Sequence, residues 1–237
     1  MQVVKRLFRN NYSGEDIYTA AIYTNGLWSY DKEFVPRVLE NQKFGGQAVV
    51  IGNGTSRLKF DLNHLQNKKV QTYGCNALYR DFETDFLIAV GNNIGNEIRQ
   101  SGYAADHVVY STTDNIIKHP NTFHLIPQNP GWNAGAIAVY LACFDGHSTI
   151  YLLGHDGLDT PGYFNNVYKN TNAYNVDEDK LTDRFWALSM GHVFKTYNLV
   201  DFVLVSETGK GYMPAEWLGY TNLRRINFRE LILECDL

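Results

Sequence analysis

Five short polar segments follow apolar stretches of this sequence and carry residue types that bind ligands or move protons. The first consists of Gly52, Asn53, Gly54, Thr55 and Ser56. Glycine lets the backbone approach a phosphate or a sugar closely, and the two hydroxyl side chains add hydrogen-bond donors. No GKS or GKT follows, so this is not a P-loop, and the GxGxxG fingerprint is incomplete. The segment is a candidate nucleotide loop, and a tight turn capped by its serine is the alternative.

Asparagine recurs in the next three segments. Asn76 and Asn92 each follow a glycine-containing turn, and Asn133 precedes Ala134 and Gly135 at the start of an apolar stretch. An amide side chain can bind a base edge or a ribose without the desolvation cost of a charge. Helix N-terminal amides also favour an anion, although Asn133 as a simple N-cap is the alternative. One asparagine at a strand end is usually a turn residue, but its repetition favours a ligand site.

The fifth segment contains the titratable pair His155 and Asp156. A histidine near neutral pH is partly unprotonated, so His155 is a candidate general base. Asp156 is a second candidate, and a cap for neighbouring backbone amides is the alternative role for it. His192 lies among apolar residues of a predicted helix, which favours a packed or surface histidine.

Apolar runs between these segments predict the elements that position them. Several runs are apolar on consecutive positions, which is typical of a sheet covered on both faces. Strands alternating with helices indicate parallel βαβ units. We therefore expect an α/β fold, a mostly parallel Rossmann-like sheet with helices on both faces, in one domain over 1–237 with a lid-like loop near 157–178. The stretch before residue 45 is ambiguous, and 227–234 reads as a closing helix or an edge strand. The predicted strands are 48–52, 70–73, 86–90, 108–110, 123–126, 150–153 and 202–205, and the predicted helices are 93–100, 134–144 and 179–197.

Composition narrows the function classes. The 237 residues are 44% hydrophobic and 19% charged, with 21 basic and 25 acidic residues and a net charge of −4. This balance gives no electrostatic reason for strong nucleic-acid binding. Three scattered cysteines without a CxxC pair argue against a zinc site and favour a reducing compartment. No run of about 20 apolar residues predicts a membrane span, so we expect a cytoplasmic protein.

The strings VVIGNGTS, GCNALYRDF and GWNAGAIAVYLACFDGHSTIYLLGHD resemble bacterial CMP-sialic-acid-dependent sialyltransferases. The wider group with a GxGPSL-type loop is similar too, including proteins of the pterin pyrophosphokinase type, and so are uncharacterised tailed-phage proteins. The similarity covers about 48–156 and, weakly, 194–206. It implies that the glycine loop faces the phosphate and sugar of a nucleotide. It also implies that Asn76 and Asn92 contact the donor nucleotide, with 133–135 near the base and ribose.

The same resemblance implies that tyrosines of the lid assist the departing phosphate, and Tyr163 and Tyr168 are the nearest equivalents. Two features depart from the family. Thr55 stands where the family has proline, and no histidine lies between His155 and His192, where the family carries its catalytic histidine. These departures leave the donor sugar open.

The sequence therefore predicts a metal-independent glycosyltransferase that uses a nucleotide-activated sugar as substrate and needs no cofactor. The absence of a DxD motif agrees with a site without a metal. The acceptor could be a glycan, a lipid sugar or a modified nucleobase. The protein could also form a homo-oligomer. One alternative is a pyrophosphokinase-like nucleotide-transferring enzyme. The other is a non-catalytic nucleotide-binding phage protein, which would work in the host cytoplasm.

Overall fold

The computed structural model describes residues 3–10, 17–37, 39, 41, 45–67, 69–160, 163–174 and 182–237. The chain contains two compact units. One comprises Met1–Glu40 with Ala89–Pro130, and the other comprises Asn41–Ile88 with Gly131–Leu237. A compact unit need not be a separate domain, so the single domain with a lid near 157–178 stays a prediction, and part of that lid lies outside the described residues.

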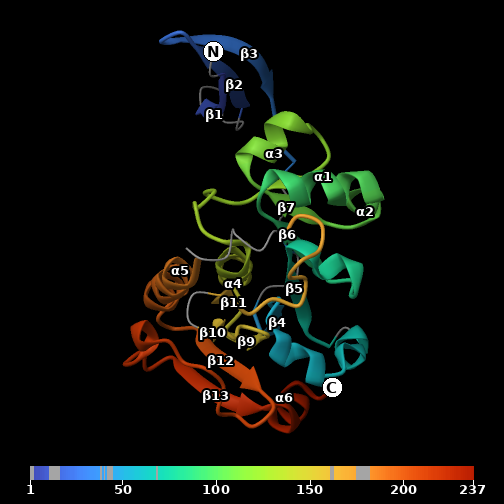
Figure 1. Ribbon diagram of the computed structural model, residues 1–237, viewed down its shortest axis with the longest axis vertical. Helices are drawn as coiled ribbons and strands as arrows, with labels where there is room; N and C mark the ends of the chain where they lie inside the picture. Colours follow the sequence, from blue (N-terminus) through green and yellow to red (C-terminus); the bar gives the residue numbers. More distant parts are fainter. Residues whose placement is uncertain are drawn as a thin grey trace. The chain divides into compact units, whose positions relative to one another are not determined.

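Eight strands form a sheet of order β13-β12-β9-β4-β5-β6-β7-β8 (Figure 1). The strand pairs on both sides of β4 are parallel, as are those at the two ends of the sheet. This confirms the predicted α/β class, and each predicted strand overlaps an observed one. The strands are β4 (Gln47–Ile51), β5 (Gln71–Cys75), β6 (Phe86–Ala89), β7 (Val109–Ser111), β8 (His124–Leu125), β9 (Thr149–Leu153), β12 (Asp201–Ser206) and β13 (Leu223–Asn227).

Helix α4 is the most apolar helix and has the predicted bounds, Ala134–Phe144. Its residues Ala136–Cys143 are all buried, and it packs over β4, β5 and β9. The ambiguous stretch near the C-terminus ends β13 and then forms α6, with Asn227 and Glu230 in a capping box. The other helices are α1 (Asn92–Ser101), α2 (Tyr103–Asp106), α3 (Thr113–Lys118), α5 (Thr182–Thr196) and α6 (Phe228–Cys235).

Helix α5 forms within the predicted range 179–197, but the apolar face that the helical spacing of Phe185, Leu188 and Val193 predicts is only partly correct. Phe185 and Leu188, expected to face the core, are 46% and 51% exposed. The helix instead turns Trp186 toward Trp217, a residue of the segment after β12, with ring centroids 4.8 Å apart. A tertiary partner thus decides which side of the helix is buried. The buried side carries Trp186, Ala187, Met190, Val193 and Phe194.

The stretch before residue 45, ambiguous in sequence, contains an antiparallel sheet of order β1-β2-β3. Its strands are β1 (Val4–Asn10), β2 (Ile17–Thr24) and β3 (Leu27–Phe34). Asn25 and Gly26 connect β2 to β3 with φ of 52° and 82°, the backbone that a two-residue hairpin turn needs. A further pair, β10 (Leu158–Thr160) and β11 (Tyr163–Phe164), is also antiparallel.

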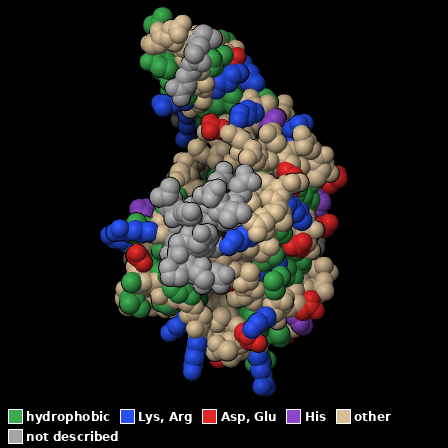
Figure 2. Space-filling view, viewed as in Figure 1, with side chains coloured by type: hydrophobic (Ala, Val, Ile, Leu, Met, Phe, Trp, Pro, Cys, Tyr) green, Lys and Arg blue, Asp and Glu red, His purple; other side chains and the backbone are tan. Residues whose placement is uncertain are grey.

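The mixed charge of the surface and the limited apolar length of the helices agree with the composition. On the face shown in Figure 2, basic and acidic side chains are interspersed. Among the described residues, none of the helices has the length and apolar character to cross a bilayer.

Candidate functional site

The strand order places a topological switch point between β4 and β9. The chain runs from β4 outward through β5 to β8, then returns to place β9 on the other side of β4 and continues to β12 and β13. In open α/β sheets, ligands bind at the carboxyl ends of the strands at such a point. The loops after β4 and β9 are the polar segments at Gly52–Ser56 and Gly154–Gly157.

Glycines allow these two loops to lie backbone against backbone. The Gly54 N–H donates to the Gly154 carbonyl at 2.8 Å. A Cβ on Gly52 would lie 2.5 Å from the same oxygen, and one on Gly54 would lie 2.4 Å from Asp156 Oδ2. The glycines therefore serve the contact between the loops, in addition to any approach of a ligand.

The Asp156 carboxylate stabilises this contact between the two loops through hydrogen bonds. Its Oδ2 accepts from the Ser56 N–H at 2.7 Å and from Asn165 Nδ2 at 3.2 Å, and its Oδ1 accepts from the Ser56 hydroxyl. These bonds occupy both carboxylate oxygens. The alternative role for Asp156, a cap for backbone amides, matches this geometry better than that of a free base.

We expect Gly54→Ala to lower the free energy of unfolding by about 1–3 kcal/mol, because the new methyl overlaps the Asp156 carboxylate and a backbone carbonyl. Urea denaturation measures this. Gly131→Ala is the matched control, since its Cβ meets nothing within 4 Å and the change should stay within about 0.5 kcal/mol. Equal stability of the two variants would show that the loops separate at little cost.

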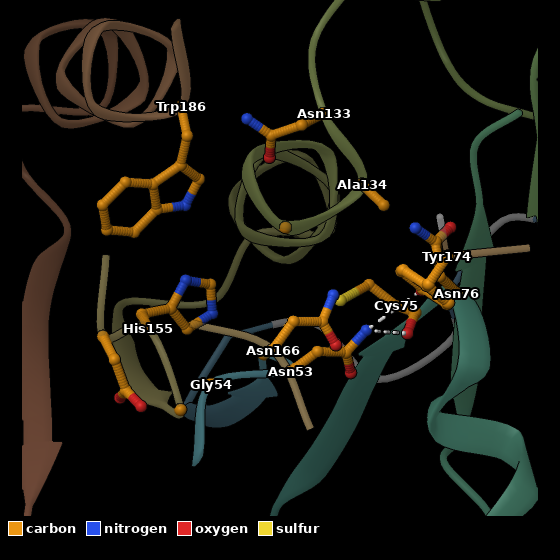
Figure 3. A pocket seen from close by; sticks show the side chains of 14 residues that line it. Asn53, Gly54, Cys75, Asn76, Asn133, Ala134, His155, Asn166, Tyr174 and Trp186 are labelled. Carbon is orange, nitrogen blue, oxygen red and sulfur yellow. Dashed lines mark hydrogen bonds between the residues drawn. The ribbon is translucent and has the colours of Figure 1, made fainter. Parts of the chain in front are cut away.

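A cavity of about 180 Å³ opens at this switch point, within one compact unit (Figure 3). Nine of the predicted site residues line it, drawn from the loops after β4, β5 and β9 and from the start of α4. Its described lining is Gly52, Asn53, Gly54, Cys75, Asn76, Asn133, Ala134, Gly135, Gly154, His155, Asp156, Asn166, Tyr174 and Trp186.

Three buried polar atoms of the lining have no hydrogen-bond partner among the described residues: Asn53 Oδ1, Asn133 Nδ2 and His155 Nε2. The other halves of both amides are engaged. Asn53 Nδ2 donates to the Cys75 carbonyl at 3.3 Å, and Asn133 Oδ1 accepts from the Ala136 N–H at 3.0 Å. A buried polar group without a partner costs about 1–3 kcal/mol. Their convergence on one cavity therefore indicates a polar ligand.

His155 forms one wall and is only 6% exposed. Burial lowers the pKa of its imidazole to about 4, so the ring is neutral at pH 7. The ring lies nearly parallel to that of Trp186, at 19° with centroids 6.5 Å apart. A neutral imidazole in a fixed position can form a hydrogen bond with a ligand or accept a proton at Nε2.

The opposite wall brings together Asn53, Cys75 and Tyr174. Asn53 Nδ2 lies 3.4 Å from the Tyr174 hydroxyl. Burial raises the pKa of Tyr174, so its phenol stays protonated and can donate to a ligand. Burial also raises the pKa of the Cys75 thiol to about 12, so it is no thiolate nucleophile at neutral pH.

Tyr168 lies elsewhere. Its hydroxyl donates to Asp81 Oδ2 at 2.5 Å and accepts from Arg57 Nη2 at 2.8 Å. Tyr168 and Arg57 are 5% and 3% exposed, and Tyr168 is not among the lining residues of the cavity. These contacts attach the loop after β11 to the glycine-loop segment. Tyr163 begins β11, and its side chain lies outside the described part of the chain.

The described part of the predicted lid is docked on the glycine loop. The Val167 N–H donates to the Asn53 carbonyl at 2.7 Å, and the Thr55 N–H donates to Asn165 Oδ1 at 3.3 Å. This docking brings Asn166 and Tyr174 to the cavity.

Like Tyr168, three further predicted residues do not line the cavity. Thr55 and Ser56 follow the glycines but point to another space, and Asn92 begins α1 in the other compact unit. The sequence prediction missed five lining residues, Cys75, Gly154, Asn166, Tyr174 and Trp186. An indole inside the predicted amphipathic helix was the available signal for Trp186. Within the described ranges, no three His, Cys, Asp or Glu side chains gather as a metal site would require.

Comparison with solved structures gives distant likenesses. The chain is similar to the sialyltransferase CstII from Campylobacter jejuni in complex with a substrate analogue, cytidine-5'-monophosphate. That likeness has a TM-score of 0.45 and 15% identity, and it covers 80% of this chain and 97% of that one. A variant of sialyltransferase CST-II in complex with CMP is similar with a TM-score of 0.48 and 14% identity, covering 80% and 98%. No protein-family model and no curated protein matches the sequence.

Proposed function

We propose that the cavity at the β4/β9 switch point binds a nucleotide-activated sugar and that the protein transfers the sugar to an acceptor hydroxyl. The observation that carries the proposal is the convergence of three unpartnered buried polar atoms, on Asn53, Asn133 and His155. Amide and imidazole groups suit the base and ribose of a nucleoside, which offer both donors and acceptors.

The charges of the site favour a donor with one phosphate. Apart from Asp156, the described lining residues are uncharged at neutral pH. The partial positive charge that this lining offers to an anion is therefore the N-terminus of α4. The N–H of Gly135 lies there, in the first turn of an 11-residue helix, and helix N-termini stabilise an anion by about 0.3–1 kcal/mol. This is enough for a single phosphate ester, whereas a triphosphate brings several more charges.

In the proposed reaction, the acceptor oxygen bonds to the anomeric carbon of the sugar as the bond from that carbon to the phosphate oxygen breaks. The nucleoside monophosphate leaves with the electron pair. His155 Nε2 takes the acceptor proton, and the phosphate beside it stabilises the imidazolium. Tyr174 donates from the opposite wall to the phosphate, in the place that the resemblance gave to Tyr163 and Tyr168.

A panel of nucleotides tests the proposal. CMP, UMP, AMP and GMP at 1 mM, with EDTA present, should include at least one that raises the melting temperature. A ligand at 100 times its Kd stabilises by about 2.7 kcal/mol. The sugar donor built on that nucleotide should be hydrolysed by the protein in EDTA.

Other outcomes distinguish the alternatives. Consumption of ATP that requires magnesium and exceeds any donor hydrolysis would overturn the proposal and support a pyrophosphokinase. Binding of a nucleotide without turnover of any donor would instead leave a non-catalytic nucleotide-binding protein.

A further inference from the structure

A second cavity, of about 360 Å³, lies beside the first at the carboxyl ends of β4, β9 and β12. The first cavity, called the nucleotide cavity from here on, is lined from the β5 side of β4. The second cavity is lined from the β12 side. Thr55, Lys59, Ser206 and Tyr212 line the second cavity and not the first. Both lie in the same compact unit.

Among the described residues, His155 and Asp156 are the two that line both cavities. Asp156 is held by Ser56 and Asn165, whereas His155 Nε2 has no partner among the described residues. A group-transfer reaction needs two substrates that reach the same reacting atoms in fixed positions. Two cavities that meet at an imidazole supply this arrangement.

The lining of the second cavity indicates what it would hold. Thr55, Ser206 and Tyr212 bring hydroxyl groups, and the Ser206 hydroxyl oxygen accepts from the Gly211 N–H at 3.1 Å, which fixes the loop after β12. Tyr212 packs on the Gly157 backbone so closely that a Cβ there would lie 2.4 Å from its ring. These three hydroxyl groups offer donors and acceptors, as a polyhydroxylated ligand requires.

The charge of the second cavity distinguishes between uncharged and polyanionic acceptors. Lys59 is paired with Glu207 at 2.5 Å, so the ammonium of this cavity already has a carboxylate partner. Binding of nucleic acid requires several basic groups that neutralise phosphates. The described lining contains one basic residue and the carboxylate of Asp156, which disfavours a polyanion.

We propose that the second cavity is the acceptor subsite and that it binds an uncharged saccharide, one hydroxyl of which reaches His155 Nε2. This proposal rests on the proposed function, since it names the second substrate of the same reaction. The acceptor hydroxyl loses its proton to the imidazole as its oxygen bonds to the donor sugar.

Thr55→Trp and Ser206→Trp test the subsite, because each indole fills the second cavity from a different wall. Leu199→Trp is the control, at a residue 94% exposed and outside both cavities. With neutral methyl glycosides as acceptors, both blocking variants should lower the ratio of transfer to hydrolysis at least tenfold. The Kd of the nucleoside monophosphate, which reports the first cavity, should move less than threefold. The control should match wild type in both measurements.

The outcomes separate this proposal from the proposed function. A wild-type protein that neither binds a nucleoside monophosphate nor hydrolyses a donor contradicts the proposed function. Hydrolysis without transfer to any neutral glycoside, or transfer to a single-stranded oligonucleotide instead, overturns the saccharide subsite alone. Folded blocking variants that both keep the wild-type ratio also overturn it. Circular dichroism and melting temperature establish folding, and either wall variant suffices if the other fails to fold.

Discussion

His155→Gln is expected to lower sugar-transfer turnover about 10²–10⁴-fold, the usual contribution of a general base. The affinity for the nucleoside monophosphate should fall less than tenfold, because the lost proton acceptor acts on the incoming hydroxyl. Because burial holds the pKa of the free-enzyme imidazole at about 4, kcat/KM should bend near pH 4 and not near 6.5. Turnover and its pH profile, measured on both proteins, check this.

The same substitution should change how stability depends on pH. Below about pH 6.5 the unfolded chain protonates this histidine while the folded protein does not until about pH 4. Wild type should therefore lose about 3 kcal/mol through this group as pH falls between those values, and the variant should lack that loss. His124 and His147, whose pKa values burial also lowers, act equally in both proteins and cancel.

His192→Gln is the control for both measurements. His192 is exposed on α5, its ring 5.3 Å from that of Trp132, and it lines neither cavity. A His155→Gln protein that keeps the full rate would place the base elsewhere.

The framework of the site could be predicted from sequence because its strands are apolar on consecutive positions. Helix α4 has its predicted bounds, since Asn133 caps its start and Gly146, with φ of 86°, follows its end. Strands that are apolar on consecutive positions and helices with capped ends depend on local sequence signals. The placement of the polar loops at the carboxyl ends of the strands followed from the expected parallel topology.

Side-chain direction could not be predicted in the same way. Thr55 and Ser56 directly follow the glycines, yet a short 3-10 helix from Thr55 turns them toward the second cavity. Tyr168 and Tyr174 of the lid carry no local sequence signal that distinguishes them. Contacts with distant residues, Arg57 and Asp81 for Tyr168 and Asn53 for Tyr174, gave them different positions.

Gly135 provides the most direct test of the nucleotide cavity, because the fold can accept a side chain there. An added Cβ would lie 3.5 Å from Asn133 Oδ1, 3.6 Å from His155 Cε1 and 3.8 Å from Trp186 Nε1, which are ordinary contacts. Its φ lies outside the left-handed region. Alanine is also the better helix former, by up to about 1 kcal/mol in a helix interior. The substitution should thus leave the melting temperature equal or higher.

The added methyl nevertheless occupies space between three lining residues of a cavity of only about 180 Å³. Overpacking of this kind costs about 1–3 kcal/mol, so Gly135→Ala should bind the nucleoside monophosphate about 10–100-fold more weakly, as measured by isothermal titration calorimetry. Gly131→Ala, four residues earlier and in open space, should bind like wild type. Loss of affinity without loss of stability separates a blocked ligand from a damaged fold, which a substitution at Gly54 cannot do. If Gly135→Ala binds as tightly as wild type, the ligand does not occupy the space between Asn133, His155 and Trp186, and the nucleotide site must lie elsewhere.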